Sequence, residues 1–145
     1  MDTVMNVEVN FLAIVLAMVS SFVVGAVWYS EGVFGAQWRE LIKMDKKTMQ
    51  KGPGGRAWVL TVVAAFLEAY VLAHVTYLAA MFFTDRSWMN VALTTAFWMW
   101  VGFQLSLVLT HDSFERRPLK LTIMTAAHQL VTLLVMGVIV GLFKV

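Results

Sequence analysis

The sequence predicts an all-α integral membrane protein, a four-transmembrane-helix bundle that forms a single membrane domain over residues 1–145. Hydrophobic residues make up 60% of the chain and charged residues 14%, whereas a soluble domain is about 45–50% apolar and about 25% charged. Four apolar runs reach the roughly 20 residues that a spanning helix needs. They lie at about 9–29, 57–83, 88–110 and 119–143. The alternating segments of about 10 residues that a membrane β-barrel would show are absent.

The connection between the first two runs predicts a short interfacial amphipathic helix at about 33–49. Its apolar side chains recur close to helical spacing, and its charged side chains lie largely on the other side, as in helices that rest on a membrane surface. Pro53 and its neighbouring glycines then break the helix. Aromatic residues gather where the first span meets this segment, and we interpret them as interface anchors at a structural corner. They are Trp28, Tyr29, Phe34 and Trp38.

Basic residues are concentrated on one side of the predicted membrane. With four spans, the first and third connections share a side, and they hold all of the 11 lysine and arginine residues except Arg86 and Lys144. The positive-inside rule places that side in the cytoplasm and both termini outside it. Because these basic residues are juxtamembrane, we expect contacts with membrane lipids and no nucleic-acid partner. Arg116 and Arg117 suit an anionic lipid headgroup, but they suit a simple topology signal equally well.

Short motifs run along the chain in the order VNFLAIVLA, GAVWYS, FGAQW, AYVLAH, WVGF and FERRPLKLTI. Together they resemble a bacterial membrane family known as domain-of-unknown-function family 1761. The resemblance covers nearly all of the chain and implies a four-helix protein of the bacterial inner (cytoplasmic) membrane, with no established activity. Glu68 and His128 depart from it, since less polar residues are expected at those positions.

Five polar residues within the predicted spans form a candidate intramembrane site: Glu68, Tyr70, His74, Gln104 and His128. An ionisable residue inside a span costs about 2.5–3.5 kcal/mol on insertion scales, so each is a functional-site hypothesis. At about 1.5 Å of rise per residue, Glu68, His128 and Gln104 lie roughly 16, 12 and 9 Å from the cytoplasmic ends of their helices and can share a layer. Tyr70 and His74 are i, i+4 neighbours on another face of the second helix.

The residues leave two roles of Glu68 open. A protonated Glu68 that is hydrogen-bonded to Gln104 or His128 would be structural, whereas an ionised Glu68 reached by water would suit proton-coupled work. His74 and His128 have the same ambiguity, because a histidine in a helix is more often a hydrogen-bonded packing residue than a ligand.

We expect no cofactor and no metal. His74 and His128 differ by about 14 Å in depth, which is too far for both imidazoles to bind one haem iron. No H-E-x-x-H spacing occurs, and the chain contains no cysteine, which excludes thiolate metal sites.

Function is predicted only as a class. The preferred hypothesis is a homo-oligomeric transporter or channel for a small solute, linked to protons or cations, because four short helices alone enclose no large pathway. The alternative is a non-transporting protein that binds lipid or docks a partner protein. An enzyme ranks third, because no nucleophile with an oriented base is legible. The GxxxG spacing at 137–141 gives modest support for self-association.

Overall fold

The computed structural model describes residues 7–144, apart from the side chains of Lys46 and Met49. Its described part is helical, and four helices are long and apolar enough to cross a membrane. They are α1 (Phe11–Trp28), α4 (Gly55–Phe82), a continuous rod made of α5 (Trp88–Met99), η1 (Trp100–Leu105) and α6 (Ser106–Phe114), and α7 (Leu119–Phe143). The predicted fold class is therefore confirmed.

Polar residues define where two of these helices begin. The Oδ1 atom of Asn10 accepts hydrogen bonds from the backbone N–H groups of Leu12 and Ala13, at 3.0 and 3.3 Å. The Oγ atom of Ser87 accepts from the N–H of Asn90 at 3.2 Å. Both side chains satisfy donors that the first turn of a helix leaves unpaired, so the apolar runs begin as helices at defined points.

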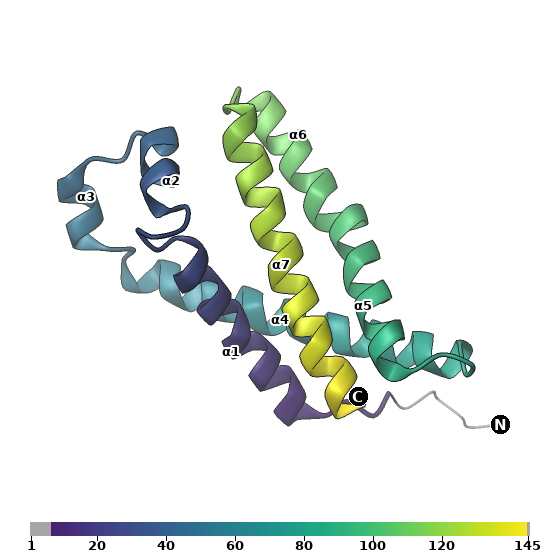
Figure 1. The fold of residues 1–145 in the computed structure, drawn as a ribbon. Coiled ribbons are helices and arrows are strands. Elements are labelled where there is room, and N and C mark those ends of the chain that lie inside the picture. The colour runs from purple at the N-terminus through teal and green to yellow at the C-terminus, as the bar shows by residue number, and fades with distance from the viewer. Residues whose placement is uncertain (1–6, 145) are drawn as a thin grey trace.

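Three of the four long elements lie side by side. The rod α5–η1–α6 runs antiparallel to α7, and α1 packs on α7 from the other side, as Figure 1 shows. Alanine dominates where they meet, with Ala13, Ala17, Ala92 and Ala96 fully buried. Small side chains let membrane helices approach closely and gain dispersion contacts.

The GxxxG motif is part of this packing. A Cβ atom built on Gly137 would lie 3.1 Å from Cβ of Ala96, and one on Gly141 would lie 2.9 Å from Cα of Met89. Both glycines are buried against α5 within one chain. The motif therefore serves contact between α7 and α5, and it no longer supports self-association.

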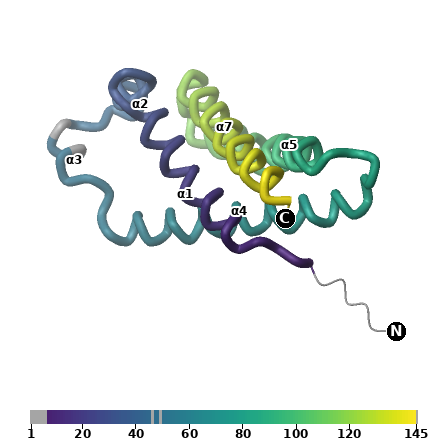
Figure 2. Tube along the Cα trace, turned by 60° about the horizontal axis from the view of Figure 1, so that its bottom comes forward, coloured from purple at the N-terminus to yellow at the C-terminus, as the bar shows by residue number. Residues whose placement is uncertain are grey.

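Helix α4 lies obliquely across the other helices in both views of the chain (Figures 1 and 2). Its second half packs between α1 and α5, where Ala69, Leu72 and Ala73 are fully buried. Every residue from Lys51 to Ala64 is exposed. The first half of α4 thus diverges from the bundle and leaves space beside α1 and α7.

The segment between α1 and α4 contains two helices, α2 (Gly35–Ile42) and α3 (Lys46–Lys51). The prediction of one continuous helix at about 33–49 is wrong, because Lys43 has a left-handed backbone (φ 53°) and ends α2. The Oδ1 atom of Asp45 then accepts a hydrogen bond from the N–H of Thr48 at 2.8 Å, which starts α3. The helical spacing of apolar residues in this segment does not indicate that the helix ends at Lys43.

A candidate intramembrane binding site

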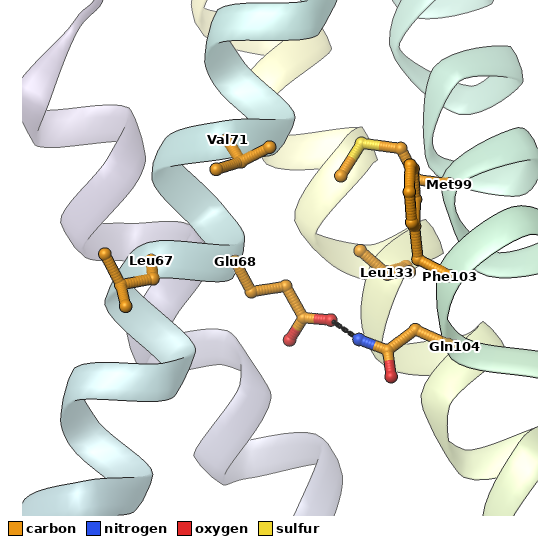
Figure 3. Close-up of a pocket in the computed structure, with 7 residues that line it drawn as sticks. All are labelled: Leu67, Glu68, Val71, Met99, Phe103, Gln104 and Leu133. Atoms are coloured by element: carbon orange, nitrogen blue, oxygen red, sulfur yellow. Dashed lines mark hydrogen bonds between the residues drawn. The ribbon is translucent and has the colours of Figure 1, made fainter. Parts of the chain in front are cut away.

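A hydrogen bond between two helices lies at the centre of the candidate site. Glu68 is on α4 and Gln104 is in η1, and Nε2 of Gln104 donates to Oε1 of Glu68 at 2.6 Å. Figure 3 shows that the second carboxylate oxygen points away from Gln104, back toward the start of α4. Gln104 therefore holds one oxygen of Glu68, and the other has no hydrogen-bond partner among the described residues.

Gln104 belongs to a six-residue π-helical segment, Trp100–Leu105. A π-helical turn is wider than an α-helical turn and occurs frequently at functional sites. Here it contains two side chains that bond to different helices, because Nε1 of Trp100 donates to the carbonyl oxygen of Ala126 in α7 at 2.8 Å. The segment thus connects the rod to α4 through Gln104 and to α7 through Trp100.

Glu68 lines two cavities. The smaller, of about 310 Å³, lies between α4, the rod and α7, and its walls include Leu67, Met99, Phe103 and Gln104 (Figure 3). The larger, of about 750 Å³, lies between α1, the first half of α4 and α7. Pockets for drug-sized ligands span about 300–1,000 Å³, so the larger cavity can accept a small organic molecule.

The larger cavity joins the aromatic corner to Glu68. Tyr29 and Trp38 line it near the basic connections, and His128 lines it from α7. The predicted grouping of Glu68, Gln104 and His128 therefore corresponds to one region, in which Gln104 contacts Glu68 directly and His128 shares the larger cavity with it.

The rings of the corner residues pack against one another and against His128 in tilted arrangements. Ring centroids lie 4.6 Å apart for Trp28 and Phe34, and 5.2 Å apart for Tyr29 and Trp38. The imidazole of His128 lies 5.1 Å from the ring of Tyr29 and 5.8 Å from that of Trp28. The four residues predicted as interface anchors thus form a packed cluster, and two of them also form a wall of the larger cavity.

Two polar atoms within this cluster are buried without a hydrogen-bond partner among the described residues. They are Nε2 of His128 and Nε1 of Trp28. Gly25 faces the imidazole, and a Cβ atom there would lie 3.7 Å from Nε2, an ordinary contact distance. Buried polar atoms in proteins are almost always hydrogen-bonded, so the cluster has capacity to bind a polar group.

Tyr70 and His74 lie elsewhere. Their rings are 5.3 Å apart, and the ring of Tyr70 lies 6.5 Å from that of Phe11 at the start of α1. Neither lines either cavity that contains Glu68. The five-residue candidate site therefore divides into a group around Glu68 and a separate aromatic pair between α4 and α1.

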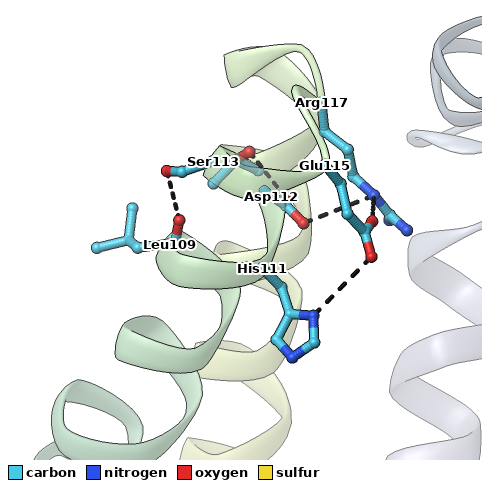
Figure 4. Close-up of polar contacts among 7 residues, drawn as sticks. Leu109, His111, Asp112, Ser113, Glu115 and Arg117 are labelled. Carbon is cyan, nitrogen blue, oxygen red and sulfur yellow. Dashed lines mark hydrogen bonds and ion pairs between the residues drawn. The ribbon is translucent and has the colours of Figure 1, made fainter.

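Asp112 was missed by the sequence reasoning. It is 7% exposed near the end of α6, and its Oδ2 atom accepts a hydrogen bond from Thr122 of α7 at 2.7 Å. Arg117 lies with its Nε atom 3.7 Å from Oδ1 of Asp112 and 2.6 Å from Oε2 of Glu115 (Figure 4). The only signal in the sequence is that Asp112 precedes Arg116 and Arg117 by four and five residues.

These contacts bear on the predicted lipid headgroup site. Both arginines are exposed. Arg117 is paired with Asp112 and Glu115, whereas Arg116 has a positive φ of 54° and forms no ion pair among the described residues.

Among residues 7–144, no group of three or more His, Asp or Glu side chains gathers where a metal ion could be held.

The profile of the family described as "Protein of unknown function (DUF1761)" matches residues 12–141. The chain belongs to this family. No curated protein and no solved structure matches it. Because the family description names no activity, the geometry around Glu68 has to support any functional assignment.

Proposed function

We propose that this protein transports a small solute across the membrane, linked to proton or cation binding at Glu68. The observation that supports this most strongly is that one carboxylate lines two cavities on different sides of α4. A coupling ion or a solute has to reach such a carboxylate, and the two cavities offer two approaches to Glu68.

The chemistry of a carboxylate in a membrane supports the same proposal. An ionised carboxylate in an apolar setting is costly unless a proton, a cation or hydrogen-bond donors compensate its charge. Gln104 supplies one donor to one oxygen. The second oxygen then binds either a proton or a cation. Because the two compete for the same carboxylate, binding of one is coupled to release of the other.

Proteoliposomes with an entrapped pH-sensitive dye test the role of Glu68 directly. A valinomycin-induced potassium potential drives protons inward, and we expect the wild-type protein to raise the influx above that of empty liposomes. Glu68→Gln keeps the shape and the neighbour Gln104 but removes the titratable group, so its flux should fall to the empty-liposome level. Glu40→Gln, in the exposed part of α2, is the matched control and should match wild type. Wild-type flux from Glu68→Gln would remove Glu68 from the mechanism and favour a non-transporting lipid-binding or partner-docking protein.

We further propose that the protein resides in a bacterial inner membrane with the basic connections in the cytoplasm and both termini outside. The distribution of lysine and arginine supports this orientation. Because the chain has no cysteine, single cysteines can report it. Thr84→Cys should react with an impermeant maleimide in intact cells, and Gly32→Cys only after lysis. The reverse pattern would invert the topology.

We also propose a homo-oligomer, because the exposed first half of α4 leaves one side of the larger cavity without a helix of its own chain. A second copy would complete that wall. Val59→Cys, 62% exposed on α4, should form disulfide-linked dimers in membranes. Leu107→Cys, 55% exposed on α6, is the control and should not. Absence of a dimer at positions along 55–64 would argue for a monomer.

A further inference from the structure

The walls of the larger cavity combine aromatic rings with a single carboxylate. Phe22, Tyr29, Trp38 and Trp58 contribute rings, and the centroids of Phe22 and Trp58 lie 6.4 Å apart. Small and apolar residues of α1 and α4 fill much of the remaining surface. A ligand that fills this cavity needs an apolar body, because most of the wall surface that it would contact is apolar.

The charge of the lining is specific. Glu68 is the acidic residue among those that line the cavity, and no lysine or arginine is among the described lining residues. His128 and Tyr29 are the other titratable groups. An ionised Glu68 therefore makes the cavity attractive to a positive charge, since its free oxygen has no basic residue of the lining beside it.

Aromatic rings favour the same kind of ligand. The face of a tryptophan or tyrosine ring attracts a cation, most strongly when the cation is poorly hydrated, as a substituted ammonium is. Sodium or potassium would lose most of its hydration shell in this cavity. Apart from Glu68, the side-chain oxygens of the lining are neutral ones, from Ser21, Tyr29, Thr61, Gln129 and Thr132. An organic cation loses less hydration free energy, because its own apolar groups already surround the charge.

We propose that the larger cavity binds an amphipathic organic cation, with its charge at Glu68 and its apolar body against Tyr29, Trp38 and Trp58. This inference rests on the proposed function, because it names the substrate class of the same carboxylate. The exposed side of Trp58, which is 54% accessible, makes it part of the cavity's mouth between α1 and α4.

A pair of isosteric ions of opposite charge tests the proposal. Tetraphenylphosphonium and tetraphenylborate have nearly the same shape, so a difference in their binding to the full-length protein in micelles reports the sign of the charge alone. We expect the wild-type protein to bind tetraphenylphosphonium and to discriminate against tetraphenylborate. Glu68→Gln should weaken binding of the cation by about tenfold or more, since a buried charge partner is lost.

A tryptophan pair isolates the aromatic contribution. Trp58→Leu should weaken cation binding about two- to fivefold, as loss of one partly exposed cation–π contact predicts. Trp98→Leu is the matched control, because Trp98 is 63% exposed on α5 and lies outside the larger cavity, and its affinity should equal that of wild type. Thermal unfolding of each variant confirms that the comparison is made between folded proteins.

The outcomes separate this inference from the transport proposal. Equal binding of both ions, or an affinity that Glu68→Gln leaves unchanged, would overturn the organic-cation assignment, and a preference for tetraphenylborate would indicate an anionic lipid site instead. If Glu68-dependent proton flux persists in either case, transport stands and only the substrate class is wrong. Cation binding that depends on Glu68, without any Glu68-dependent flux, would instead support a binding protein that does not transport.

Discussion

Gly141 of α7 lies against Met89 of α5 so closely that a Cβ atom on the glycine would stand 2.9 Å from Met89 Cα and 3.1 Å from its Sδ atom. Real Cβ atoms do not approach backbone carbon atoms this closely, so the contact admits only glycine unless one helix shifts. The packing of α5 on α7 supports the rod that carries Gln104. Close packing therefore joins α7 to the start of the rod.

Gly141→Ala should destabilise the protein by about 1–3 kcal/mol, the usual cost of forcing an extra methyl group into a packed interface. Denaturant titration in micelles, followed by circular dichroism, measures the free energy of unfolding. Gly102→Ala is the control, because a Cβ atom at Gly102 would meet nothing within 4 Å. Equal stability of Gly141→Ala and wild type would mean that α5 and α7 lie far enough apart at Gly141 and Met89 to accept a methyl group.

The bond from Trp100 to the carbonyl oxygen of Ala126 gives a second prediction. Trp100→Phe keeps an aromatic ring but removes the donor, and the free energy of unfolding should fall by about 0.5–1.5 kcal/mol. Trp98→Phe makes the same chemical change at an exposed site and should have little effect. A cost for Trp98→Phe as large as that for Trp100→Phe would show that ring size rather than the hydrogen bond determines the loss.

Much of the architecture follows from the sequence because a membrane permits few solutions. Apolar runs of sufficient length must be helices, and the runs near 9–29 and 119–143 correspond to α1 and α7. Helix rise permits Glu68 and Gln104 to share a layer, although the predicted helix ends place them about 7 Å apart in depth. With α4 beginning at Gly55 and the rod ending at Phe114, their depths become about 20 and 15 Å, so the difference narrows to about 5 Å.

The cavities could not be predicted, because they depend on how the helices tilt. Composition permits a 28-residue helix such as α4 to span with some tilt, but packing sets the angle. Because the first half of α4 diverges, Tyr29 and Trp38, predicted as interface anchors, also form a cavity wall. The π-helical segment was equally hidden, because Trp100–Leu105 has the composition of an ordinary apolar helix.

Gly35 at this corner gives a third prediction. A Cβ atom there would lie 2.3 Å from the carbonyl oxygen of Tyr29 and 2.7 Å from that of Ser30, and the N–H of Gly35 donates to Ser30 at 2.9 Å. Gly35→Ala should break this turn, with a loss of about 1–3 kcal/mol and faster hydrogen exchange at residue 35. Gly32→Ala, three residues earlier and with nothing within 4 Å, should change neither. Slow exchange in Gly35→Ala would show that the corner tolerates a side chain.

The ion pair between Glu31 and Arg39 gives a fourth prediction, which concerns pH. Arg39 donates a hydrogen bond to Glu31 across the turn between α1 and α2, and this bond, with the charge of the guanidinium, holds the pKa of Glu31 below its ordinary value of 4.5. A carboxyl with a lowered pKa in the folded state contributes stability above its unfolded pKa, and that contribution is lost as pH falls through the folded value. The turn should therefore loosen only below pH 4.5.

Titration of the Glu31 carboxyl carbon by NMR in micelles measures this shift. Arg39→Gln removes the guanidinium that donates the hydrogen bond to Glu31, and its charge with it, so the pKa of Glu31 should rise toward 4.5, because both interactions favour the ionised form. Arg86→Gln removes an arginine from the opposite end of the bundle and should leave the Glu31 titration as in wild type. An unchanged titration in Arg39→Gln would mean that the two side chains do not pair in solution. The corner beside the larger cavity would then be held by its packed rings and by backbone hydrogen bonds such as that from the N–H of Phe34 to the carbonyl oxygen of Trp28, at 3.1 Å.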